Sequence, residues 1–265
     1  MVGLLITLLF AAGATGAGLL LFRPLLKDLD PALRLGTAAL LGLGFAGFIT
    51  LPIGLLPQGV KWGIGVMALI ALAGLYILYQ DRDSLKLKSP QGPWLFIPLA
   101  IALAALMALI GALTPSDMNE WDALAYHLAV PKLWVQHGRI DFIPYIHHSN
   151  FPFAVDNLYI WGLQWGGQSG AKAFQLAFYL AGMAAVFGLA RQRYGQPAAW
   201  WSLLAYATIP AAMWEAGTAY IDLAHGLYAG LGILFAALWL DDQQKSTLWL
   251  SALMLGLAVA SKYTG

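Results

Sequence analysis

The 265-residue sequence has no cysteine and few charged residues. Without cysteine, disulfide bonds and metal sites built on thiolates are excluded. Asp, Glu, Lys and Arg make up 10% of the chain, against roughly 25% in an average soluble domain. The formal net charge is +1 and no basic stripe runs along the sequence, so we expect no nucleic-acid partner.

Apolar residues, by contrast, are abundant: they form 60% of the chain, and the mean hydropathy is +0.70. Runs of about 20 apolar residues, long enough to cross a bilayer, recur along the sequence. Because lipid offers the backbone no hydrogen-bond partners, each run should be helical. The sequence therefore predicts an all-α integral membrane protein with about eight transmembrane helices. The predicted spans are 2–22, 35–56, 62–79, 94–113, 173–190, 197–214, 222–240 and 248–261.

Lys and Arg concentrate in the connections after the first, third, fifth and seventh predicted spans. Nine of the fourteen lie there: Arg23, Lys27, Arg34, Arg82, Lys86, Lys88, Arg191, Arg193 and Lys245. Because cytoplasmic loops carry such an excess, we expect the N-terminus and the loop 114–172 to face outward from the inner (cell) membrane. The first run also ends in small residues, as a signal peptide does, but no basic segment precedes it, which favours a span.

The loop 114–172 is far longer than the usual connection between packed helices, and loops of this length are usually functional or disordered. It is too rich in aromatic residues to be disordered. Its first half predicts an interfacial helix that Asp122 caps, Pro131 kinks or ends early, and Gly138 stops. A turn at SNFP should follow, and then a short apolar helix ended by the glycine pair of LQWGG. We expect this extracytoplasmic loop to fold against the outer leaflet.

Ionisable residues gather on the same predicted side of the membrane. The stretch NEWDALAYHLAVPKLW holds Glu120, Asp122 and His127. WEAGTAYIDLAHG, before the seventh span, adds Asp222, and GLAVASKYTG ends the last span with Lys262. Ionisable groups at the ends of spans suggest a functional site, although helix caps and snorkelling side chains also explain them singly.

These segments, in this order, resemble the GT-C membrane glycosyltransferases, in the bacterial branch akin to protein O-mannosyltransferases and lipid A aminoarabinose transferases. The similarity covers about residues 94–265, which we expect to form the core, incomplete at its C-terminus, with 1–93 as a three-helix N-terminal extension. The resemblance implies transfer of a sugar from a polyprenyl phosphate to an extracytoplasmic acceptor, which is a glycan, lipid or protein. Relatives often place two acids side by side where this chain has Asp122 and Ala123.

The resemblance also implies roles for single residues. Asp122 and Asp222 would be catalytic, with Asp122 as base or as an acid linked to a metal, and Lys262 would bind the phosphate. Glu120 joins Asp122 as a metal candidate; oxygen ligands suit Mg²⁺ or Mn²⁺, and a histidine would admit Zn²⁺. The remaining substrate-binding candidates are Tyr126, His127, Asp156, His147 and Tyr220. Two other function classes remain open, a secondary transporter and a non-catalytic subunit of a membrane complex.

Overall fold

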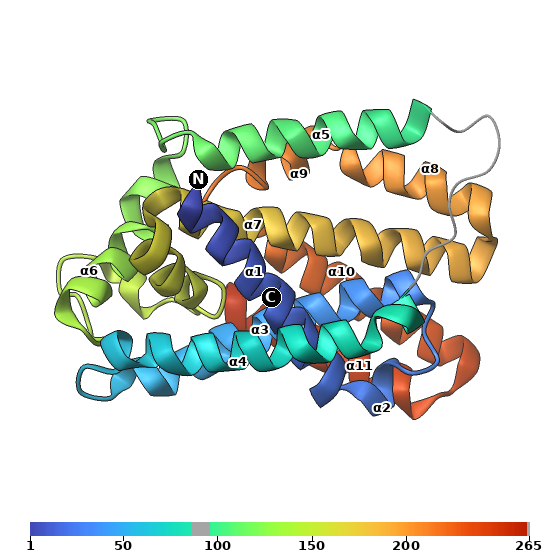
Figure 1. Ribbon diagram of the computed structural model, residues 1–265, viewed down its shortest axis with the longest axis horizontal. Coiled ribbons are helices and arrows are strands. Elements are labelled where there is room, and N and C mark those ends of the chain that lie inside the picture. Colours follow the sequence, from blue (N-terminus) through green and yellow to red (C-terminus); the bar gives the residue numbers. More distant parts are fainter. Residues whose placement is uncertain (86–95, 264–265) are drawn as a thin grey trace.

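The computed structural model describes residues 1–85 and 96–263, and within them it contains helices and no strands (Figure 1). This confirms the all-α fold class. The α-helices are α1 (Val2–Leu21), α2 (Arg23–Leu26), α3 (Pro31–Leu55), α4 (Gly59–Asp81), α5 (Phe96–Leu113), α6 (Ala129–His137), α7 (Asp156–Tyr194), α8 (Gln196–Ala207), α9 (Pro210–Glu215), α10 (Asp222–Asp242) and α11 (Lys245–Ser261).

Six of the described helices are long and apolar enough to cross a membrane: α1, α3, α4, α5, α7 and α10. The eighth predicted span corresponds to α11, which has 17 residues. The sixth, 197–214, is not one helix, because the chain leaves the helical conformation at Ile209, directly before Pro210. A residue before proline is pushed toward extended geometry, which separates α8 from α9. Residue 94, where the fourth span was predicted to begin, and the expected domain boundary lie outside the described residues.

Helix α7 runs through the middle of the bundle, and α1 and α3 pack directly on it (Figure 1). Small residues allow these contacts. A Cβ added at Gly36 of α3 would lie 2.4 Å from the backbone nitrogen of Ala185 in α7, and one at Gly16 of α1 would lie 1.8 Å from the carbonyl oxygen of Gly74 in α4. Backbones that approach this closely are typical of helix pairs within membranes.

The first eleven residues of α7 fold back on the rest of the helix. Gly167, with φ 58° and ψ −148°, breaks the helical geometry, as the glycine pair of LQWGG predicts. Gly162 then lies against Gly170, with its Cβ position 2.6 Å from the carbonyl oxygen of that residue. Every residue from 156 to 162 is buried, so this segment packs among the helices, and the position of the loop at the outer leaflet stays a prediction. Trp161 explains the burial, since its indole donates to Thr50 of α3 at 2.8 Å.

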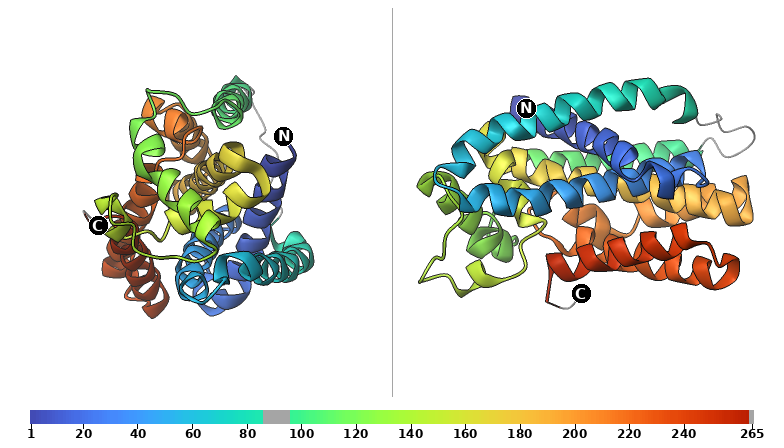
Figure 2. Two further views of the ribbon diagram at one scale, coloured as in Figure 1. Left: turned by 90° about the vertical axis from the view of Figure 1, so that its left-hand side faces the viewer. Right: turned by 90° about the horizontal axis from the view of Figure 1, so that it is seen from below.

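The connections predicted to share one side of the membrane do lie together at one end of the bundle. Arg191 at the end of α7 pairs with Asp30 before α3 at 2.7 Å, and Arg193 pairs with Asp241 at the end of α10. The loop that follows α5 lies at the opposite end (Figure 2). Which end faces the cytoplasm stays a prediction, and Lys86 and Lys88 lie outside the described residues.

Candidate functional site

The segment that carries Asp122 is helical but irregular. Asp122 has helical dihedral angles and makes no capping hydrogen bond with its side chain, so the predicted N-cap is wrong. The kink expected from Pro131 is present as a single π-helical turn, Ala123–His127. Pro131 cannot donate to the carbonyl of His127, four residues back, and its ring crowds that carbonyl. Gly138 ends α6 with φ 75°, as predicted.

The π-helical turn directs His127 toward the start of α7. Its Nδ1 lies 2.5 Å from Oδ1 of Asp156, and both side chains are almost fully buried. π-helical turns are rare and often occur at functional sites. A carboxylate on one ring nitrogen fixes the orientation of an imidazole and leaves the other nitrogen for a ligand. Both residues are separate candidates in the sequence, and the structure pairs them.

A cavity of about 190 Å³ opens beside this pair. Its lining includes His127, Asp156, Tyr126, Phe151, Phe153 and Lys262. The cavity therefore gathers side chains from the loop, the start of α7 and the end of α11. Apolar walls with a few convergent polar groups are typical of sites for small molecules.

Asp122 lies at the edge of this group and is tied to it through Tyr220. The backbone N–H of Asp122 donates to the hydroxyl oxygen of Tyr220 at 3.3 Å. The hydroxyl of Tyr159, in the buried part of α7, donates to the backbone carbonyl of Tyr220. Burial, then the charges of Asp122 and Asp156, raise the pKa of Tyr126. The ring of Tyr220 lies 5.8 Å from the ring of His127. The structure thus brings Asp122 together with the His127–Asp156 pair.

Asp222 and Lys262 form an ion pair at the mouth of the site, with both side chains about two-fifths exposed. Glu215 lies close by and accepts a hydrogen bond from the backbone N–H of Leu223 at 2.5 Å. Burial, then the charge of Asp222, raises the pKa of Glu215 from 4.5 to about 7. The sequence placed Glu215 on this face without counting it as a site residue. Its position shortly before the apolar helix that begins at Asp222 is the sequence feature that could have marked it as a site residue.

Glu120 has a different partner from the one expected. Its Oε1 lies 2.8 Å from Nζ of Lys172, which is fully buried and also donates to the carbonyl of Thr114 at 3.0 Å. Within the described residues, no three or more His, Asp or Glu side chains are grouped as metal ligands. The oxygens of Asp122 and Glu120 do not fit a metal site well, because the carboxylate of Glu120 already pairs with the ammonium of Lys172. Metal binding remains a prediction, and no step below depends on it.

His147 does not line the cavity. It is exposed and its ring packs on His148 at 3.8 Å, whereas His148 stacks on Tyr126 at 4.3 Å with the rings almost parallel. Burial, then the neighbouring His147, lowers the pKa of His148. Sequence reasoning chose between two adjacent histidines without a signal that separates them, and the one that contacts Tyr126 is His148.

Comparison with known proteins adds one match. Residues 165–265 match the family described as dolichyl-phosphate-mannose-protein mannosyltransferase. No curated protein and no solved structure is significantly similar to the chain. The matched segment holds Asp222 and Lys262, and it begins after Asp122. Together with the apolar helices, the match over residues 165–265 supports the resemblance to membrane glycosyltransferases of the GT-C type.

Proposed function

We propose that this protein transfers a sugar from a polyprenyl-phosphate carrier to a hydroxyl group of an acceptor on the extracytoplasmic side of the membrane. The observation that carries the proposal is a cavity at one end of a bundle of apolar helices, lined by Lys262 and by the His127–Asp156 pair. Asp222 pairs with Lys262, and Asp122 is linked to the pair through Tyr220. The matched family is named for a polyprenyl-phosphate donor of this kind.

The proposed reaction is a displacement at the anomeric carbon of the sugar. The acceptor oxygen forms the new bond, the bond between the anomeric carbon and the phosphate oxygen breaks, and the phosphate leaves with the electron pair. Asp122 takes the proton of the acceptor hydroxyl as general base. The ammonium of Lys262 stabilises the charge that grows on the phosphate, and Asp222 holds that ammonium in place.

The remaining polar groups would bind the sugar. His127 lines the cavity, and Asp156 fixes its ring. We assign it a hydrogen bond to a sugar hydroxyl. The phenols of Tyr126 and Tyr220 lie on the side of Asp122 and offer further hydroxyl partners. Aromatic rings beside the cavity suit stacking against the faces of a sugar.

The test measures transfer of labelled sugar from a panel of polyprenyl-phosphate sugars in membranes that hold the protein as the cell makes it. Lys262→Met should lower kcat/KM by about 10²–10³, as loss of one electrostatic donor does. Asp122→Asn should lower kcat by at least about 10², the usual contribution of a general base. Asp117→Asn is the matched control, since Asp117 is an exposed acid of the same loop that caps its own turn. Equal activity in all variants, or no transfer from any donor, would overturn the proposal.

A further inference from the structure

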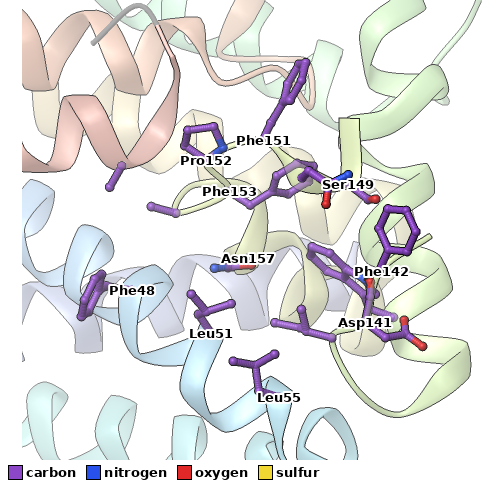
Figure 3. A pocket seen from close by; sticks show the side chains of 15 residues that line it. Phe48, Leu51, Leu55, Asp141, Phe142, Ser149, Phe151, Pro152, Phe153 and Asn157 are labelled. Carbon is purple, nitrogen blue, oxygen red and sulfur yellow. The ribbon is translucent and has the colours of Figure 1, made fainter. Parts of the chain in front are cut away.

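A second and larger cavity lies on the other side of the wall formed by Phe151, Pro152 and Phe153. Its volume is about 400 Å³, and these three residues line both cavities. The far wall is the apolar face of α3, with Phe48, Leu51 and Leu55 (Figure 3). We call this space the α3 groove. It is a neighbour of the proposed transfer site and separate from it.

One side of the α3 groove is continuous with the surface that faces lipid. Phe48, Leu51 and Leu55 are exposed on α3, one of the six helices suited to cross a membrane. Large apolar side chains that are exposed on a transmembrane helix contact acyl chains. A molecule that enters over these residues therefore comes from the bilayer, and its chain lies along α3.

The inner end of the α3 groove holds an unused hydrogen-bond acceptor. Asn157 is 2% exposed and its Nδ2 donates to the carbonyl oxygen of Gly47 at 3.1 Å. That bond fixes the orientation of the amide, so the remaining atom is Oδ1, which is buried and has no partner. Figure 3 shows Asn157 between Leu51 and Phe153. A buried oxygen without a partner is costly, and a ligand hydroxyl satisfies it.

The charges around the α3 groove argue against an anionic head group. Among the described lining residues none is Lys, Arg or His. Asp141 contributes a carboxylate, which contacts Nδ1 of His137 at 3.0 Å and Nε of Arg139 at 3.7 Å, and neither of these two residues lines the groove. The lysine suited to a phosphate, Lys262, lines the smaller cavity instead. A phosphate in the α3 groove would meet acceptor oxygens and no cation of the lining, whereas a neutral hydroxyl would donate to Oδ1 of Asn157.

From these features we infer that the α3 groove binds the acceptor of the proposed reaction, and that this acceptor is a membrane lipid with an uncharged, hydroxyl-bearing head. The inference rests on the proposed function in one respect, since it takes the bound lipid to be the acceptor of that reaction. The apolar wall holds the chain, Asn157 accepts from the head, and residues 151–153 line both the groove and the cavity with Lys262.

The first test is photo-crosslinking in membranes with diacylglycerol that carries a diazirine in one acyl chain, compared with phosphatidic acid bearing the same chain. Diacylglycerol should label peptides of α3 and of the 140–154 segment more strongly than phosphatidic acid. Leu51→Trp fills the groove and should abolish this labelling. Leu9→Trp is the control, because Leu9 is exposed on α1 away from the groove. Asn157→Leu should weaken labelling about fivefold, the effect of one neutral hydrogen bond.

The second test separates this inference from the proposed function. Sugar transfer to diacylglycerol that Leu51→Trp abolishes and Leu9→Trp preserves supports the acceptor assignment. Transfer to a water-soluble acceptor that Leu51→Trp leaves unchanged overturns that assignment while the glycosyltransferase proposal stands. Stronger labelling by phosphatidic acid, or labelling that Leu51→Trp leaves unchanged, overturns the assignment of the α3 groove as a site for an uncharged lipid, whatever the transfer assay shows.

Discussion

Nδ1 of His127 lies 2.5 Å from Oδ1 of Asp156, and the two side chains are 3% and 2% exposed. The residues are 29 positions apart in the sequence and come from different elements, the π-helical turn and the first turn of α7. Two polar side chains this deeply buried are stable only as a pair, since either one alone would lose its hydration without replacement. The pair therefore joins the loop that carries Asp122 to the centre of the bundle.

Replacement of Asp156 by alanine should lower the free energy of unfolding by about 3–5 kcal/mol, because His127 would stay buried without its partner. The double variant with leucine at both positions should recover much of that loss. Chemical unfolding in detergent micelles compares the parent protein with the two variants. A single-variant loss below about 1 kcal/mol, the range of exposed pairs, would mean that the contact contributes little to the fold.

The buried Lys172–Glu120 pair should also stabilise the fold, and the exposed Arg193–Asp241 pair serves as its comparison. Lys172 is fully buried, so Lys172→Met should leave the carboxylate of Glu120 without a counter-charge and cost about 3–5 kcal/mol of unfolding free energy. Arg193 and Asp241 form a pair whose side chains are 39% and 61% exposed, and Arg193→Ala should cost less than about 1 kcal/mol. Thermal unfolding of the two variants side by side checks the order. A larger effect at Arg193 would contradict it.

The features that the sequence predicted best depend on local rules. Apolar runs mark the six long helices, Gly138 marks the end of α6, and the pair at 166 and 167 marks the break in α7. Asp222 and Lys262 are 40 positions apart, yet both stand at helix ends on one predicted side, and the structure pairs them. Position along a span was enough to find them.

The features that were missed depend on tertiary contacts. The burial of the segment before Gly167 follows from Trp161, which fits between Gly63 and Thr50 of two other helices, and no local pattern shows such a fit. Lys172 did carry a signal, since a lysine within an apolar run needs a partner inside the membrane protein. Its partner Glu120 could not be read from the sequence, because 52 residues separate them. The break before Pro210 was visible in the letters TIPAA and should have divided the sixth span.

Glu215 predicts how stability responds to pH. Its pKa is raised from 4.5 to about 7 in the folded protein, so the folded state holds this proton more tightly than the unfolded state does. That contribution is present at pH below 4.5 and is lost as the pH rises through the interval up to about 7. Glu215 is outside the six candidate spans, so protons reach it from water.

The expected result is that Glu215→Gln makes the melting temperature less sensitive to pH over this interval. In the parent protein the glutamate contributes a fall in melting temperature with rising pH, and glutamine, which does not titrate, removes that part. Scanning calorimetry of both proteins in one detergent, with buffer pH as the variable, gives the difference curve. If the difference in melting temperature between the two proteins stayed constant with pH, the carboxyl of Glu215 would have the same pKa in the folded and the unfolded protein.

Gly167 sets the direction in which α7 returns Asp156 to the site. Its φ of 58° and ψ of −148° lie where residues with a side chain are strained, and no atom lies within 4 Å of an added Cβ. Gly167→Ala should therefore cost about 1–3 kcal/mol of unfolding free energy through the backbone alone.

Gly65 is the matched control: it is exposed within α4, its Cβ position is equally free, and its φ is helical. Gly65→Ala should be neutral or stabilise by up to about 1 kcal/mol. Thermal unfolding of both variants makes the comparison, since neither alanine meets a neighbour. A loss of stability in Gly167→Ala alone would come from the backbone conformation of the turn. Equal effects of the two substitutions would show that the turn accepts a side chain.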